Sequence, residues 1–357
     1  MIKKLMFSVA MLASAAFCCA KEYRADISKY LSVGTSQSYE CVAVMAHLAG
    51  FEEFNKEDTT GKIASYDEYF KPYLKNPKVK KSLSYIKKLR RSGFSYDAIG
   101  SAGTYLNTDC HSYRVDYDIL KKYLDPRCGN PEKLLNAVST FYDETHFEEF
   151  YDSNISFYGQ TAQIWLSHSK DLQKAIEEVQ KYYKSETNKV FISSSILNYN
   201  NNFGTSFNDG KNVYFEPKYC AFYYDDWLIV HELSHPCTRP VVDELYKNPE
   251  IKKYFESHFN GSRAKIMKKQ AYGTPYISFN ELINRANEIA VLQNYLPDTY
   301  VKQVIKRYIE NGFTEIELVL DILQPYRTGN YASLMDFEPI LEKELTERIT
   351  ITKVLVQ

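Results

Sequence analysis

The stretch from Asp225 to Pro236, DDWLIVHELSHP, decides how the rest of the chain is interpreted. His231 and His235 are four positions apart, so on an α-helix both imidazoles lie on one face, about one turn apart. Neutral imidazoles are good zinc ligands. Glu232, beside the first histidine, can accept the proton of a metal-activated water as that water attacks a carbonyl. The spacing therefore predicts a zinc site with His231 and His235 as ligands and Glu232 as general base.

The residues around the motif predict a buried helix with an early end. Trp227, Leu228, Ile229 and Val230 are consecutive apolar residues, which is typical of a helix covered on most sides. Pro236 removes a backbone donor and clashes with the preceding turn. We therefore expect the regular helix to end or bend near His235.

A catalytic zinc site needs a third protein ligand. The segment from Ser278 to Glu288 is predicted to be a capped helix that carries two glutamates seven positions apart, on one face. Glu281 is the first choice, because it lies near the helix start. It also follows His235 by enough residues for the chain to form another helix and return to the motif. Glu288 is the second candidate, and His258, at the end of another expected helix, is the third.

Hydrophobic periodicity predicts an α+β protein that is predominantly helical. A small sheet is expected just ahead of the motif, where two β-like runs flank a loop with a turn at Asn208-Asp209-Gly210. A β-like tail is expected at Ile349–Thr352. The expected helices cover residues 36–49, 79–89, 96–106, 132–142, 172–183 and most of 225–347, and the β-like runs cover 190–192 and 213–215.

The N-terminal residues indicate export. Residues 1–20 combine a charged start, a short apolar run and small residues, as in a signal peptide cleaved near Ala20. A lipoprotein anchor at Cys18 or Cys19 is the alternative, which the bulky Phe17 disfavours. No later apolar run is long enough to span a membrane.

Charge excludes one broad class of function. The chain has 357 residues with 44 Lys+Arg against 45 Asp+Glu, a formal net charge of −1. Removal of Lys3 and Lys4 with the signal peptide leaves 42 basic and 45 acidic residues, a net charge of −3. A chain of this balance is not expected to bind nucleic acid.

Five cysteines remain after the predicted cleavage, so at least one stays unpaired. Cys110–Cys128 and Cys220–Cys237 are possible disulfide pairs in an oxidising compartment. No CxxC occurs, so a cysteine-based zinc site is not expected.

Two motifs together resemble those of a known class of enzyme. The sequence HELSHP, followed downstream by NELINRA, resembles the gluzincin zinc metallopeptidases, which use HExxH and a glutamate on a later helix. Three N-terminal runs, LAGFEEF, YDEYFKPY and GFSYDA, make the chain similar to the secreted bacterial family called domain of unknown function 4932. They begin at Leu48, Tyr66 and Gly93. The similarity extends from about Glu40 to Ala290.

The resemblance implies a fold and a set of roles. It implies His231, His235 and Glu281 as zinc ligands and Glu232 as general base. It also implies a zincin-like, two-lobed metallopeptidase fold, in which residues 21–130 form a helical region packed on a catalytic region of residues 131–357. An edge strand within Asn198–Pro217 would lie above the cleft, where an extended peptide could pair with it.

The chain departs from the gluzincin pattern in three respects. Arg285 stands four residues after Glu281, where thermolysin-like enzymes carry an acid that orients a histidine. The partner of that histidine must therefore come from elsewhere. The Gly-x-Met-Glu-Asn signature of aminopeptidases is absent. The residue that stabilises the oxyanion is unassigned; the candidates are Tyr272, Tyr276, Tyr295 and Tyr326.

The sequence as a whole predicts an exported, zinc-dependent metallohydrolase, periplasmic or secreted, and an endopeptidase rather than an exopeptidase. Its expected partner is a peptide or protein substrate, without nucleic acid and without stable membrane insertion. The oligomeric state stays open. Two alternatives are a non-catalytic zincin-like binding protein and an amidase that acts on cell-wall peptides.

Overall fold

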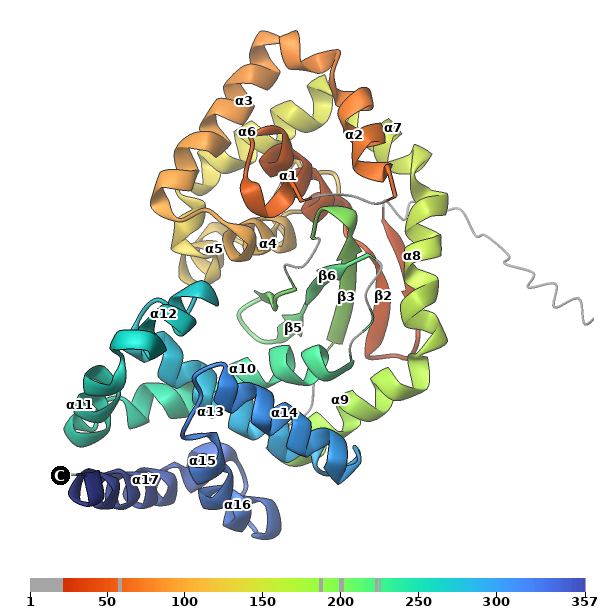
Figure 1. The fold of residues 1–357 in the computed structure, drawn as a ribbon. Helices are drawn as coiled ribbons and strands as arrows, with labels where there is room; N and C mark the ends of the chain where they lie inside the picture. The colour runs from red at the N-terminus through yellow and green to blue at the C-terminus, as the bar shows by residue number, and fades with distance from the viewer. Residues whose placement is uncertain are drawn as a thin grey trace, which may run out of the picture.

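The computed structural model describes residues 22–56, 60–185, 189–198, 202–221, 224 and 226–356. The predicted signal peptide lies outside these residues. The fold is predominantly helical with one small mixed sheet, as expected (Figure 1). The strands are β1 (Tyr23–Asp26), β2 (Leu31–Thr35), β3 (Lys189–Ser195), β4 (Ser206–Asn208), β5 (Val213–Phe215) and β6 (Lys218–Cys220). The helices are α1 (Gln37–Leu48), α2 (Lys62–Phe70), α3 (Pro77–Leu89), α4 (Tyr96–Tyr105), α5 (Tyr117–Tyr123), α6 (Pro131–Glu144), α7 (Phe147–Ser153), α8 (Ile155–Ser167), α9 (Ser169–Tyr183), α10 (Asp226–Leu245), α11 (Pro249–His258), α12 (Gly261–Lys269), α13 (Pro275–Leu292), α14 (Asp298–Glu310), α15 (Ile316–Ile322), α16 (Gln324–Thr328) and α17 (Leu334–Val356).

The sheet has the order β1-β2-β3-β5-β4, and β6 continues the path of β5 along β3. β3 pairs in parallel with β2, β5 and β6, while β4 is the antiparallel edge. Phe203 forms a bridge with Lys218 in the same register in which Asn208 pairs with Val213. The edge therefore extends from Phe203 to Asn208, within the segment that the resemblance implied.

The turn of this hairpin forms where it was predicted. Gly210 has a φ of 90°, which glycine adopts without strain. The Asp209 side chain accepts hydrogen bonds from the amides of Lys211 and Asn212. Such Asx turns are the reason that this residue combination indicates a reversal of the chain.

Two groups of helices enclose two hydrophobic cores. One core lies among the N-terminal helices α1 to α7 and is rich in aromatic residues such as Tyr66, Phe70 and Phe150. The other lies among α9, α10, α13, α15 and α17, below the sheet in Figure 1. Along the described chain, no helix is both long enough and apolar enough to cross a bilayer.

The structure differs from two expectations about helix ends. Of the expected end or bend near His235, the end is wrong, because α10 continues to Leu245 with Pro236 and Pro240 inside it. The buried side chains of Val241, Val242 and Leu245 hold the continued helix against the second core, which offsets the cost of the prolines. The predicted β-like tail at 349–352 is part of α17 instead, because Leu341, Leu345 and Ile349 recur at helical spacing and are fully buried.

The cysteines do not form the suggested pairs. All five described cysteines are free thiols. The Cys41 thiol is hydrogen-bonded with that of Cys110, whereas the Cys128 thiol lies 3.3 Å from the carbonyl oxygen of Ala98. Cys110 therefore contacts α1 rather than Cys128.

Candidate metal centre

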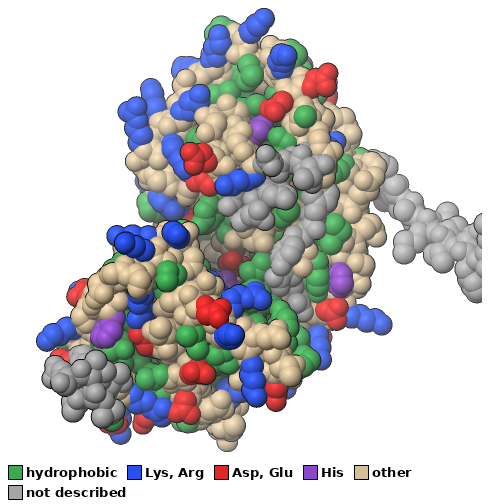
Figure 2. All heavy atoms as spheres, viewed as in Figure 1, with side chains coloured by type: hydrophobic (Ala, Val, Ile, Leu, Met, Phe, Trp, Pro, Cys, Tyr) green, Lys and Arg blue, Asp and Glu red, His purple; other side chains and the backbone are tan. Residues whose placement is uncertain are grey.

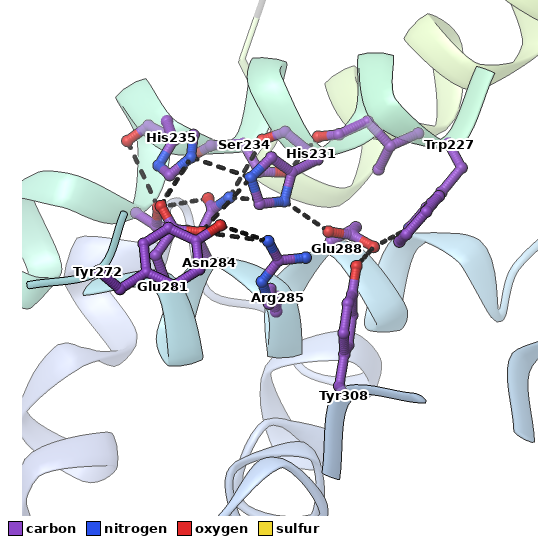
Figure 3. Close-up of polar contacts among 12 residues, drawn as sticks. Trp227, His231, Ser234, His235, Tyr272, Glu281, Asn284, Arg285, Glu288 and Tyr308 are labelled. Atoms are coloured by element: carbon purple, nitrogen blue, oxygen red, sulfur yellow. Dashed lines mark hydrogen bonds and ion pairs between the residues drawn. The ribbon is translucent and has the colours of Figure 1, made fainter. Parts of the chain in front are cut away.

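Three side chains converge between α10 and α13 (Figure 3). The Nε2 atoms of His231 and His235 are 3.1 Å apart. The Glu281 carboxylate lies 3.6 Å from His231 Nε2 and 3.4 Å from His235 Nε2. Ligands at about 2.1 Å from a tetrahedral zinc ion would be roughly 3.3 Å from one another. The spacing of these three groups, all of whose ligand atoms lie within 4.8 Å of one another, fits such an ion.

A further feature of Glu281 favours a cation at this point. Glu281 is 7% exposed, and its buried Oε2 atom accepts no hydrogen bond from the described residues, although Arg285 Nη2 lies 3.5 Å away. A buried carboxylate oxygen without a partner is costly unless something else neutralises it. The orphaned oxygen belongs to the group that faces both imidazoles, where a metal would bind it.

Glu288 contacts Nδ1 of His231, the imidazole nitrogen that does not face the other two converging groups. His231 Nδ1 lies 2.7 Å from Glu288 Oε2, and Figure 3 shows Glu288 on the opposite side of the imidazole from His235. A carboxylate on one imidazole nitrogen fixes the tautomer and directs the other nitrogen at the metal. Glu288 is therefore not placed as a ligand, and it supplies the histidine partner that the sequence left unassigned.

Glu288 is itself held in a fully buried position. Its carboxylate accepts hydrogen bonds from the indole of Trp227 and, at 2.8 Å, from the hydroxyl of Tyr308. Asn284, one turn earlier on α13, donates to the backbone carbonyl of His231 at 3.1 Å. These contacts tie α13 to α10 through the residues that orient His231.

Arg285 occupies the place of the expected acid and lies against Glu281. Its Nη2 is 3.5 Å from Glu281 Oε2 and donates to the Tyr272 hydroxyl at 2.8 Å. Its guanidinium lies over the ring of Tyr308, 4.5 Å from the centroid. Arg285 is thus the cation that accompanies three carboxylates, those of Glu232, Glu281 and Glu288.

Glu232 lies between α10 and the edge strand. Gly204 donates its backbone N–H to the Glu232 carboxylate. A Cβ atom at position 204 would be 2.5 Å from Glu232 Oε2, so glycine permits this close approach of the edge strand. The proposed general base is therefore beside the three converging groups and below the sheet edge.

The protonation states suit metal binding. Burial, together with Arg285, lowers the pKa of both histidines, so both imidazoles are neutral. Burial opposes ionisation of Glu281, but interaction with the two imidazoles, the charge of Arg285 and a hydrogen bond from Tyr272 outweigh it and lower the pKa of Glu281. Burial and the neighbouring Glu281 raise the pKa of Glu232 to about 8. Without a cation Glu232 therefore keeps its proton at neutral pH, and a cation bound beside it would lower its pKa and free the carboxylate to act as a base.

The remaining candidates lie elsewhere, with one exception. The His258 ring stacks on Tyr254 at the end of α11 and is not part of the cluster. Tyr276 donates to Asp243, and Tyr326 donates to a backbone carbonyl in the second core. The Tyr295 ring lies below the Lys174 ammonium. Of the four tyrosine candidates, Tyr272 is the one at the site.

Comparison with known proteins adds no identification. No family model, curated protein or solved structure matches the chain. The assignment of function therefore depends on the geometry of the site.

Proposed function

We propose that the chain is an exported, zinc-dependent metallohydrolase with a zincin-like two-lobed fold, and that it acts as an endopeptidase. The observation that carries the proposal is the convergence of His231, His235 and Glu281 at zinc-ligand distances. Glu288 holds the first histidine from behind, and Glu232 stands beside the cluster. A site that only stabilises the fold needs no carboxylate in the position of Glu232.

Each group then has a chemical task. Zinc bound by these residues would polarise the substrate carbonyl and lower the pKa of water. Glu232 accepts the proton of the attacking water and passes it to the departing nitrogen. Glu288 keeps the proton of His231 on Nδ1, so that Nε2 remains a ligand.

The edge strand supports a peptide as substrate. The backbone groups of Phe203 bond to Lys218, which directs those of Gly204 away from the sheet and towards the Glu232 side. An extended peptide can pair with such an edge through backbone hydrogen bonds. Ser206 is exposed on this edge, and pairing of a substrate there would suit cleavage within a chain.

The proposal is tested on the chain from residue 21 onward, with bound metal measured by mass spectrometry and cleavage measured on a peptide library. We expect about one zinc per chain and cleavage that falls by about 10²–10⁴-fold in Glu232→Gln with zinc retained. Glu244→Gln, at an exposed position of the same helix, is the matched control and should cleave normally. A wild type that binds zinc and cleaves no peptide would favour the non-catalytic alternative.

A further inference from the structure

One tyrosine reaches the site from the N-terminal group of helices. Tyr96 is the first residue of α4, and its ring packs against Phe203 with centroids 5.2 Å apart. One turn later, a Cβ atom at Gly100 would be 2.4 Å from Phe203 and 2.6 Å from Thr205. α4 is therefore packed closely on the edge strand, on both sides of Gly204.

This packing places Tyr96 beside the proposed general base. Gly204, between the two residues that α4 contacts, donates to Glu232. The Tyr96 hydroxyl is near enough to interact electrostatically with the carboxylates of Glu232 and Glu281. In Figure 2 acidic and histidine side chains are visible at the bottom of the hollow between the two groups of helices. Tyr96 thus approaches Glu232 and Glu281 from α4 and the edge strand, whereas the three converging side chains lie on α10 and α13.

The hydroxyls of the nearby tyrosines differ in what they bind. Tyr272 accepts from Arg285 and donates to Glu281, and Tyr308 donates to Glu288, so the protons of both hydroxyls are already engaged. The half-buried Tyr96 hydroxyl has no hydrogen-bond partner within the described part of the chain. Burial, and then Asp97 and the two glutamates, raise the pKa of Tyr96 to about 12, so it keeps its proton at neutral pH. It is the available donor at this site.

We propose that Tyr96 is a catalytic residue that donates a hydrogen bond to the substrate carbonyl oxygen as that oxygen becomes negatively charged. The water oxygen bonds to the carbonyl carbon, the water proton moves to Glu232, and the π electron pair moves onto the carbonyl oxygen. When the C–N bond breaks, that pair reforms the carbonyl and the nitrogen takes the proton from Glu232. Tyr96 keeps its own proton throughout and stabilises the charge between these two steps.

This role rests on the proposed function. It means that both groups of helices contribute residues to the active site. The Zn ligands come from α10 and α13 near one core, whereas the hydroxyl comes from α4 beside the other. The hydroxyl is positioned through Phe203 and Gly100 rather than through the metal ligands. Its removal should therefore leave the metal site intact.

The test compares Tyr96→Phe with wild type on a peptide identified by the library digest. We expect kcat to fall by about 10²–10³-fold, with KM changed by less than about threefold and zinc content unchanged. Affinity for a phosphinic analogue of that peptide, with a tetrahedral phosphinate in place of the scissile amide, should fall by about the same factor as kcat/KM. Tyr117→Phe, at an exposed position of α5, is the matched control and should behave as wild type.

Several results would overturn the role of Tyr96. One is an unchanged kcat in Tyr96→Phe, and another is a loss that appears only in KM. A third is a comparable loss of kcat and phosphinate affinity in Tyr272→Phe but not in Tyr96→Phe. The proposed function fails in a different way, through a wild type that cleaves no library peptide. In that case the role of Tyr96 falls with it.

Discussion

Two regions of the molecule bury carboxylates, and they neutralise them differently. Behind the edge strand, Glu216 accepts from Arg114 at 2.8 Å and lies 3.2 Å from the ammonium of the fully buried Lys218. Burial alone would raise the pKa of Glu216, but Arg114 and Lys218 outweigh it and lower that pKa to about 2. This network satisfies its charges within the protein.

The cluster of carboxylates on α10 and α13 does not balance its charges within the protein. Among the described residues, Arg285 is the cation that interacts with all three of Glu232, Glu281 and Glu288, and burial raises the pKa of both Glu232 and Glu288 to about 8. If all three carboxylates are ionised, the single guanidinium leaves an excess of two negative charges, which a divalent cation would neutralise. The comparison teaches that burial of acids is common in this chain. A cluster of several carboxylates without sufficient protein cations is what marks the candidate site.

The largest loss of stability is expected at Glu216, where the protein already balances the charges. Glu216→Gln removes the acid but leaves Arg114 and Lys218 buried without their partner. Breaking a buried pair in this way costs about 3–5 kcal/mol, so urea unfolding should show a loss of that order. If the free energy of unfolding of Glu216→Gln equals that of wild type, the two regions do not differ in the way described. Glu177→Gln, on the surface of α9, is the control and should change stability by less than about 0.5 kcal/mol.

At the metal cluster the same kind of change should weaken metal binding instead of folding. Glu281→Ala removes a ligand, and we expect zinc affinity to fall by at least about 100-fold, roughly 2.8 kcal/mol. Glu288→Gln keeps all three ligands but weakens the hold on His231, so its loss should be about 10–100-fold. Competition with a fluorescent chelator measures both, and urea unfolding of the metal-free proteins should show little loss for Glu281→Ala. A larger loss in Glu288→Gln than in Glu281→Ala would contradict the assignment of ligand and partner.

Much of this site was predictable from local sequence, because its geometry is helical. His231 and His235 converge through the four-residue spacing, and Glu281 was the first choice for the third position. The role of Glu288 was not predictable, because it depends on how α13 is rotated against α10. Tyr96 precedes His231 by 135 residues, and its only signal was the run GFSYDA, which suggested a family rather than a role.

The errors in the fold have a common cause. Pro236 and the β-branched run at 349–352 both favour an interruption of helix by local criteria. In each case buried side chains at helical spacing, such as Leu245 on α10 and Ile349 on α17, pack against the second core. Tertiary packing therefore outweighed local preference where a long helix had a core to cover.

The smallest effect concerns a buried acid in a third region, Glu40, which has neither sufficient cations nor a metal-binding cluster beside it. Glu40 is fully buried, and burial raises its pKa to about 7 although Ser195 and Tyr66 donate to it. Because its pKa is higher in the folded than in the unfolded chain, where it is about 4.5, its contribution to stability is complete below pH 4.5 and is lost as pH rises through 7. Between pH 6 and 7 this amounts to about 1 kcal/mol. Glu40→Gln should therefore show a shallower decline in unfolding free energy than wild type over that interval. An equal decline in both proteins would mean that Glu40 is ionised at little cost, and that charge balance does not separate the regions of this molecule.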